Sequence, residues 1–168
     1  AHLLLGKILL AMGKGAEAEE ALLLADGLGA HRSLTLIPLA QAYLIQGKSG
    51  RLLSLLHPQG TSAEEDAELL ALRGRAYLDL GKLYDAERSF DQAWERAPDS
   101  VPALLGRVQT RRLRGAMEDA LADARRAVEL DPQNARAWYL KAGIERENGD
   151  AEQALADFDR VVEVQPTH

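Results

Sequence analysis

Apolar residues recur along the chain at helical spacing, in paired blocks that are separated by a glycine. Around Gly81, small and apolar residues follow one another every three or four positions over 70–78 and again over 83–94. This spacing is typical of the buried face of an amphipathic helix. Aromatic residues make up only 5% of the chain, and alanine and leucine dominate it, which favours helix over sheet. The pattern therefore predicts helical hairpins.

The hairpin pattern returns at a constant interval of 34 residues, which gives five units. Three residue series show the interval independently: a glycine series between the helices, a small-residue series in the first helix, and an alanine-rich series in the second. Their members are Gly13, Gly47, Gly81, Gly115 and Gly149; Gly6, Ala40, Gly74, Val108 and Ala142; and Ala18, Leu52, Ala86, Ala120 and Ala154. We expect one array over 1–168, with units at about 1–32, 33–66, 67–100, 101–134 and 135–168.

Local signals predict where the helices begin and end. Ser62 followed by Glu65 is typical of a capping box, and Ser100 and Asn134 are suitable N-cap residues. The glycine series is expected to end each first helix in a left-handed turn, and a proline closes each of the last three units. These prolines are Pro98, Pro132 and Pro166.

Small residues predict close packing between helices. We expect Gly74 to oppose Ala86 and Ala142 to oppose Ala154, with Phe90 filling the space between one hairpin and the next. The second unit is irregular. Pro38 falls inside its first helix, and the run His57, Pro58 and Gly60 is expected to shorten its second helix.

The third and fifth units carry the residues of a known repeat. In the third these are Leu70, Gly74, Tyr77, Ala86, Phe90, Ala93 and Pro98, and in the fifth Trp138, Ala142, Ala154, Phe158 and Pro166. They resemble the tetratricopeptide repeat. The resemblance implies an all-α fold, a right-handed superhelix (α-solenoid) of five helix-turn-helix repeats. It also implies a noncatalytic protein-interaction scaffold that binds its partner in a concave groove lined by first helices.

The sequences of the first three units are similar to those of a narrower group, the periplasmic repeat lipoproteins of bacterial exopolysaccharide-export and PEP-CTERM protein-sorting clusters. That similarity implies a segment of an envelope system in the periplasm or anchored to the outer membrane. Two alternatives stay open: a cytoplasmic adaptor that captures a peptide, and the substrate-presenting arm of an enzyme. The chain does not begin with Met, and we expect it to be a fragment of a longer protein.

Composition excludes several classes of function. The formal net charge of −6 argues against a nucleic-acid partner, because phosphate binding requires a positive surplus. The chain has no cysteine and no apolar stretch long enough to cross a bilayer. The four histidines, His2, His31, His57 and His168, are scattered and have no acid at metal-ligand spacing. We therefore predict no metal site, no cofactor and no catalytic residue.

The family groove suggests candidate ligand residues. The positions one residue after the small series are Lys7, Gln41, Arg75 and Gln109, and neighbouring turns add Arg112, Arg136, Tyr139 and Arg146. This lining suits a protein or an extended peptide, and also a polysaccharide, through arginine forks and tyrosine stacking. Glutamine replaces the asparagine that the chaperone-binding members use at two of these positions, so that activity is not carried over.

Two further features leave their roles open. Arg107, Arg111, Arg112 and Arg114 form either a solvated surface partly neutralised by Glu118, Asp119 and Asp123 or an anion-binding patch. The last helix carries Leu155, Phe158, Val161 and Val162, which we expect to expose apolar surface and to allow self-association through the terminal repeats.

Overall fold

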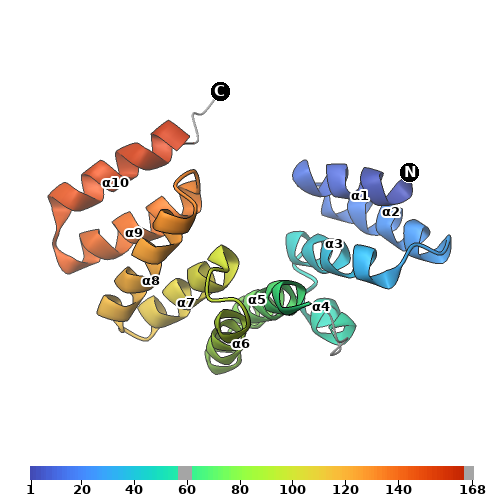
Figure 1. Ribbon diagram of the computed structural model, residues 1–168, viewed down its shortest axis with the longest axis horizontal. Coiled ribbons are helices and arrows are strands. Elements are labelled where there is room, and N and C mark those ends of the chain that lie inside the picture. Colours follow the sequence, from blue (N-terminus) through green and yellow to red (C-terminus); the bar gives the residue numbers. More distant parts are fainter. Residues whose placement is uncertain (57–61, 165–168) are drawn as a thin grey trace.

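The computed structural model describes residues 1–56 and 62–164, and within these ranges every regular element is an α-helix. The described helices follow one another in antiparallel pairs (Figure 1). They are α1 (His2–Ala11), α2 (Gly15–Gly27), α3 (Arg32–Ile45), α4 (Ser49–Leu55), α5 (Ala63–Asp79), α6 (Leu83–Arg96), α7 (Val101–Leu113), α8 (Met117–Leu130), α9 (Ala135–Asn148) and α10 (Ala151–Val164). The all-α prediction is confirmed.

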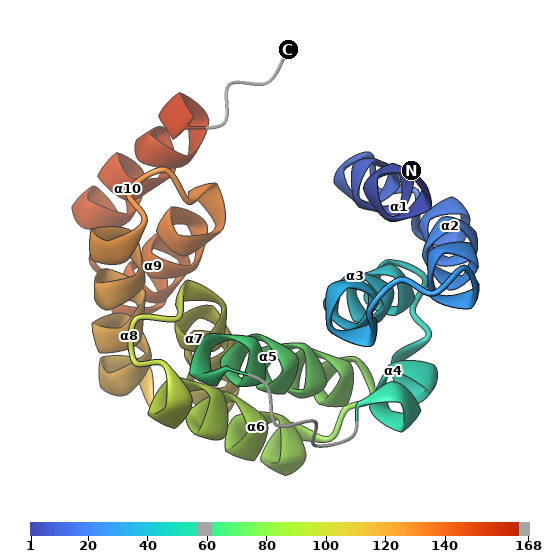
Figure 2. The same ribbon diagram turned by 45° about the vertical axis from the view of Figure 1, so that its right-hand side comes forward.

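The helical hairpins stack in a row that curves into an arc. The first helices, α1, α3, α5, α7 and α9, lie on the inner side of the arc, and the second helices lie outside them (Figure 2). Each hairpin packs on the next, so the core is divided into clusters that follow the array instead of meeting at one centre. The chain is therefore a solenoid whose inner wall is built from first helices.

The predicted helix ends are confirmed within the described residues. All five glycines of the 34-residue series have positive φ, between +67° and +91°, a backbone conformation that other residues adopt only with strain. The Ser62 hydroxyl accepts from the Glu65 amide at 3.2 Å, and the Glu65 carboxylate accepts from the Ser62 amide at 3.4 Å. Ser100 and Asn134 cap α7 and α9 through their side-chain oxygens, which accept from the amides of Ala103 and Ala137. Pro166 lies outside the described residues.

Phe90 fills the space between the third and fourth hairpins, as predicted. It is 2% exposed, and it lies between a glycine of α5 and a glycine of α7. A Cβ atom built on Gly74 would lie 2.8 Å from the ring, and one built on Gly106 would lie 2.1 Å from it. The atoms nearest to position 74 all belong to Phe90, so Phe90, not Ala86, sets the approach of α5 and α6.

The second hairpin is the irregular one, as expected. Its second helix, α4, has 7 residues and ends at Leu55, whereas α2 has 13 and α6 has 14. Helix α3 continues through Pro38, which is buried. The run His57, Pro58 and Gly60 lies outside the described residues. None of the helices in the described ranges is long and apolar enough to cross a membrane.

Candidate functional site

The inner wall of the arc carries three adjoining hollows. The first lies among α1, α3 and α5 and has a volume of about 890 Å³. The second, about 490 Å³, reaches from α3 to α9, and the third, about 610 Å³, lies among α5, α7 and α9. Arg75 lines all three, Gln41 lines the first two, and Gln109 lines the last two. Because they share these residues, the hollows form one continuous surface, which we call the concave groove.

Six of the eight predicted ligand residues line the concave groove. They are Lys7, Gln41, Arg75, Gln109, Arg112 and Arg136. The other two, Tyr139 and Arg146, are not among the residues that line these hollows. The Tyr139 ring, 57% exposed, packs edge to face on Phe158 of α10 with the ring centres 5.9 Å apart. Arg146 lies exposed in the last turn of α9.

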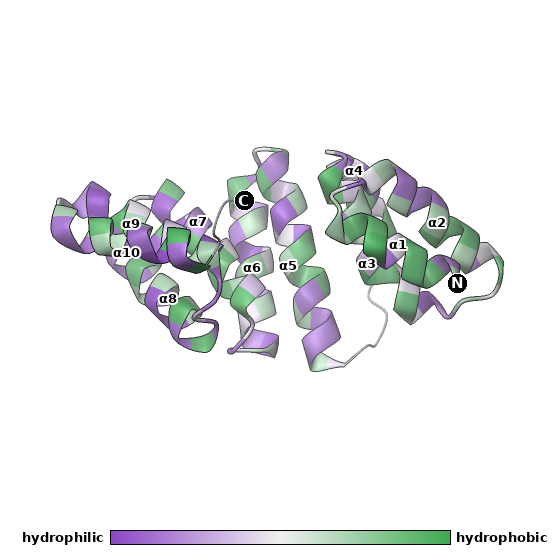
Figure 3. Ribbon diagram, turned by 90° about the horizontal axis from the view of Figure 1, so that it is seen from above, coloured by the Kyte–Doolittle hydropathy of each residue, from purple (hydrophilic) through white to green (hydrophobic). Residues whose placement is uncertain are grey.

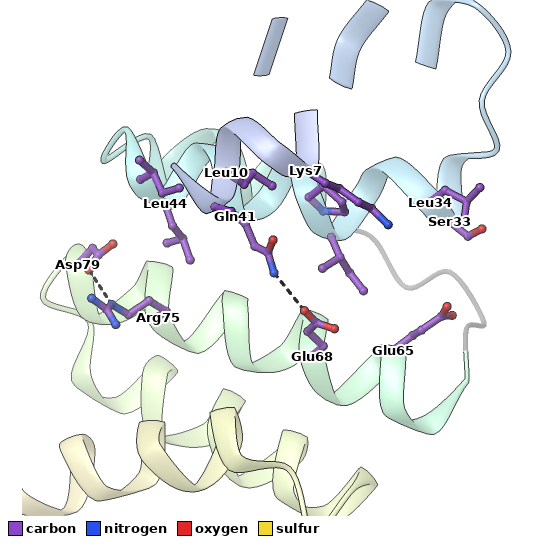
Figure 4. Close-up of a pocket in the computed structure, with 14 residues that line it drawn as sticks. Lys7, Leu10, Ser33, Leu34, Gln41, Leu44, Glu65, Glu68, Arg75 and Asp79 are labelled. Carbon is purple, nitrogen blue, oxygen red and sulfur yellow. Dashed lines mark hydrogen bonds and ion pairs between the residues drawn. The ribbon is translucent and has the colours of Figure 1, made fainter. Parts of the chain in front are cut away.

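The first hollow combines an aliphatic floor with an acidic wall on α5 (Figure 4). The Gln41 amide of α3 donates to the Glu68 carboxylate of α5 at 3.2 Å, which ties the two helices together across the floor. Burial raises the pKa of Glu68, and the charge of Glu65 raises it further, while the Gln41 hydrogen bond acts in the opposite direction. The aliphatic residues of the floor are Leu10, Leu34, Ile37, Pro38, Leu44 and Ile45.

The second hollow brings two arginines together. Arg75 forms an ion pair with Asp79, at 3.5 Å. Arg136 forms no ion pair with any residue of 1–56 or 62–164. The pKa of Arg136 is lowered, first by desolvation and then by the positive charge of Arg75. Asp131, an acid of the same hollow, already accepts from the Asn134 side chain at 3.0 Å. The hollow therefore holds two guanidinium groups whose mutual repulsion a bound anion would relieve.

Arg112 differs from Arg136 because an acid pairs with its guanidinium group. Its guanidinium donates to both carboxylate oxygens of Glu147, with the Nε distances at 3.0 Å and the Nη2 distance at 2.6 Å. This fork joins α7 to α9 at the edge of the third hollow. A ligand that used Arg112 would have to displace Glu147.

The cluster of Arg107, Arg111, Arg112 and Arg114 is not an anion-binding patch, because each of these arginines is paired with an acid. That alternative was wrong. Arg107 is only 7% exposed, and its guanidinium lies 4.3 Å from the ring centre of Trp94. Its Nε is 3.2 Å from a carboxylate oxygen of Asp91 and 3.3 Å from one of Asp123. Arg111 also pairs with Asp123, at 2.8 Å. These ion pairs join α7 to α6 and to α8.

The neutralising acids are only partly those that the sequence indicated. Asp123 was expected, and Asp119 contributes its backbone carbonyl to Arg111 at 3.2 Å. Arg114 instead pairs with Glu87, on the preceding unit, and no contact of Glu118 with the cluster is found in the described ranges. Among those ranges, no group of three or more His, Asp or Glu residues is placed to hold a metal ion.

Comparison with known proteins identifies the architecture. The family model described as "Tetratricopeptide repeat" matches residues 71–135 and 117–167, which together cover more than half of the chain. The chain belongs to the tetratricopeptide-repeat family. This confirms the resemblance read from the third and fifth units.

The individual proteins to which this tetratricopeptide array is similar share between 20% and 38% of its residues over the matched parts. It is 38% identical over 73 residues to human tetratricopeptide repeat protein 36, a match that covers 44% of the chain and only 39% of the human protein. Its fold matches TTC0263, a tetratricopeptide protein of Thermus thermophilus, with a TM-score of 0.83 and 21% identity over 99% of this chain and 91% of that one. It also matches the first tetratricopeptide domain of Spaghetti (RPAP3) bound to the HSP90 peptide SRMEEVD, with a TM-score of 0.60 and 20% identity over 66% and 87% of the chains.

Proposed function

We propose that this chain is a noncatalytic scaffold that holds an extended peptide in its concave groove, with an acidic group of the peptide between Arg75 and Arg136. The observation that carries the proposal is Arg136 in the second hollow: the charge that acts on it is the positive charge of Arg75, and it forms no ion pair within the described residues, although Glu68 and Asp131 also line the hollow. A carboxylate bound there would accept charge-assisted hydrogen bonds from both forks. It would also offset the positive charge of Arg75, which adds to the desolvation that lowers the pKa of Arg136.

The rest of the groove suits an extended ligand. The hollows run across α1, α3, α5, α7 and α9, so a ligand that filled them would touch several first helices in turn. The aliphatic floor between α1 and α5 offers apolar surface to the side chains of such a peptide. The array bound to SRMEEVD supports the same class of ligand, since that peptide is rich in acidic residues.

The polysaccharide partner, the export or sorting system and the cellular location stay predictions. A polysaccharide partner depended on Tyr139 as a stacking platform, and this ring packs on Phe158 away from the hollows. Membership of an exopolysaccharide-export or protein-sorting system, and a periplasmic or outer-membrane location, would be tested by fractionating the native host. The peptide proposal does not depend on either outcome, because it follows from the groove alone.

The experiment is a peptide-array screen followed by fluorescence anisotropy with the best binders. We expect these binders to carry an acidic residue or a free terminal carboxylate. Replacing either arginine, as Arg75→Gln or Arg136→Gln, removes charge-assisted hydrogen bonds and should weaken binding about 10- to 100-fold. Arg146→Gln is the matched control, since Arg146 is exposed on the same helix as Arg136 but does not line the hollows, and it should leave affinity unchanged. Equal affinity in Arg75→Gln, Arg136→Gln and the unchanged chain would contradict the proposal.

A further inference from the structure

The first hollow of the concave groove has two sides of different chemistry. Helices α1 and α3 supply its aliphatic floor, and Figure 3 shows α1 as largely hydrophobic, whereas hydrophilic residues recur along α5. Two residues of the floor, Leu34 and Ile45, are 50% and 47% exposed, so they present apolar surface to the hollow. On the other side, α5 supplies the carboxylates of Glu65 and Glu68 (Figure 4). The hollow therefore joins an apolar surface to an acidic rim.

The negative charge of Glu68 is not balanced by a cation of the chain. Its carboxylate accepts from the neutral Gln41 amide, and no ion pair of Glu68 is found within 1–56 and 62–164. Burial raises the pKa of Glu68, and the like charge of Glu65, one turn before it, acts in the same direction. Lys7 lines the hollow from α1 but forms no ion pair with either carboxylate (Figure 4). A positive group of a ligand would therefore meet an unneutralised acid at the rim.

The other acids of the first hollow are already engaged. Asp79 pairs with Arg75 at 3.5 Å, and the Glu65 carboxylate accepts from the Ser62 amide in the cap of α5. The Gln41 amide reaches only Oε1 of Glu68, and no donor among the described residues lies within hydrogen-bond distance of Oε2. Glu68 is therefore the acid that a ligand can use without disturbing an ion pair or a helix cap.

A lysine or arginine side chain has the shape that the first hollow requires. Both residues carry methylene groups that pack along apolar surface and a cationic end that stays in water or pairs with an acid. Such a side chain would bury its methylene groups against Leu34 and Ile45 and extend its cationic end to Glu68. A purely aliphatic side chain would leave Glu68 without a partner, and an acidic one would meet a like charge.

The basic residue would lie beside the acidic group of the peptide proposal. Glu68 lines the second hollow as well as the first, together with Arg75 and Arg136. A ligand that carried only an acid would bring its negative charge close to that of Glu68. A basic residue next to the acid cancels this repulsion, because it pairs with Glu68 while the acid pairs with the two arginines.

The register of α5 sets the separation of the two charges in the ligand. Glu68 and Arg75 are seven positions apart in the same helix, which is about 10 Å at about 1.5 Å per residue. An extended peptide advances by about 3.3 Å per residue. The basic and acidic residues of the ligand are therefore expected about three residues apart.

We propose that the ligand of the concave groove is a peptide of mixed charge, in which a lysine or arginine lies on the aliphatic floor of the first hollow and binds Glu68, about three residues from the acidic group between Arg75 and Arg136. This inference rests on the peptide proposal and adds a second contact, of opposite charge, to it. Because the two contacts lie in a fixed order along α5, they also fix the orientation of the bound peptide.

Fluorescence anisotropy with short peptides of designed charge tests the inference. One series carries a single glutamate and a single lysine, at every short separation and in both orders, and its best member should have a separation of about three residues. In that peptide the lysine is then replaced by norleucine, which keeps the aliphatic stem without the amine, or by glutamate. We expect the norleucine peptide to bind about tenfold more weakly and the glutamate peptide to bind more weakly still.

Variants of the protein test the same contact from the other side. Glu68→Gln keeps the size of the side chain and an oxygen that accepts from Gln41, so it should bind the lysine peptide about tenfold more weakly and no longer discriminate against the norleucine peptide. Glu68→Lys should reverse the preference and favour the glutamate peptide. Glu64→Gln is the matched control, since Glu64 is exposed on the same helix and does not line the hollows, and it should leave affinity unchanged. Circular dichroism checks that all variants are folded.

This inference and the peptide proposal fail in different ways. Equal affinity for the lysine and norleucine peptides would overturn the mixed-charge ligand, and so would undiminished discrimination between them by Glu68→Gln. Either result would do so even where Arg75→Gln and Arg136→Gln still weaken the binding of both peptides, as the acidic contact requires. If no peptide of the series bound, both proposals would be wrong.

Discussion

The Phe90 wedge gives a sharp test of how the hairpins pack, because the same substitution should have opposite effects at two glycines. Gly106 of α7 and Gly143 of α9 both lie inside helices, where replacing glycine by alanine favours the helix by about 1 kcal/mol. A Cβ atom at position 106 would lie 2.1 Å from two ring atoms of Phe90, whereas one at position 143 would meet nothing within 4 Å. Only Gly106→Ala therefore creates a clash.

The size of the effect follows from where the ring could move. The ring has little room to retreat from α7, because Gly74 of α5 lies on its other side, so close that a Cβ atom built there would be 2.8 Å from the ring. Overpacking of this kind costs about 1–3 kcal/mol, and a contact of 2.1 Å with a confined ring belongs at the upper end. After the helix contribution, Gly106→Ala should destabilise the array by about 2 kcal/mol, and Gly143→Ala should stabilise it by about 1 kcal/mol.

Thermal unfolding followed by circular dichroism measures both. The expected midpoints are about 4–8 °C lower for Gly106→Ala and about 2–4 °C higher for Gly143→Ala. Combining Gly106→Ala with Phe90→Leu should recover part of the loss, since the smaller side chain gives the new methyl group space; this coupling is read from a double-mutant cycle. A Gly106→Ala variant as stable as Gly143→Ala would refute the wedge.

Two buried carboxylates should give pH-dependent stability of opposite sign. The pKa of Glu19 is lowered, first by the hydrogen bond from Lys48 and also by Gln46, despite burial. Its ionised form therefore stabilises the fold above the ordinary value of 4.5 and loses that effect as pH falls, so Glu19→Gln should cost about 1–2 kcal/mol at pH 7 and progressively less in acid. The pKa of Glu145 is raised, first by burial and then by the neighbouring Asp157. Its ionised form disfavours the fold, so Glu145→Gln should raise the midpoint at neutral pH, and its advantage should shrink as pH falls toward 4.5. Midpoints measured across pH for each variant and the unchanged chain check both signs.

Helices, turns and caps could be predicted from the sequence because their signals are local or strictly periodic. Gly81 and Ser62 act on backbone within a few residues, and the interval of 34 residues repeats each signal along the chain. Phe90 could be assigned to the space between hairpins by its size. Its contact with Gly106 could not be assigned, because the register of one hairpin on the next depends on side chains from both.

The arginine cluster shows why the electrostatics of the site were harder to predict. Arg107, Arg112 and Arg114 stand on one helix or at its end, and their sequence neighbours suggested where their charges would be balanced. Arg107 pairs with Asp123, as expected, but all three arginines also pair with acids of other units, which are Asp91, Glu147 and Glu87 respectively. Spacing along one helix identifies which residues share a face, but it does not reveal which face of another hairpin lies opposite.

The predicted ligand residues that do not line the groove, Tyr139 and Arg146, both lie on α9, the last of the described first helices. Arg146 stands one unit after Arg112, at a repeat position that lines a hollow in α1, α3, α5 and α7. A hollow needs a wall on both sides, and within the described residues no first helix lies beyond α9. Tyr139 is affected in the same way and leans on Phe158 of α10 instead.

One repeat position changes its chemical character along the groove. It is occupied by Leu10, Leu44 and Leu78 in the first three units and by Arg112 in the fourth, and all four residues line the groove. The three leucines pack against the core clusters, and Arg112 pairs with Glu147 of α9, so this position contributes to packing as well as to the groove wall. The wall of the groove therefore changes at this position from leucine in α1, α3 and α5 to an ion-paired arginine in α7 without a change of fold. Under the peptide proposal, the apolar side chains of the ligand would lie toward α1, and its acidic group would lie between Arg75 and Arg136.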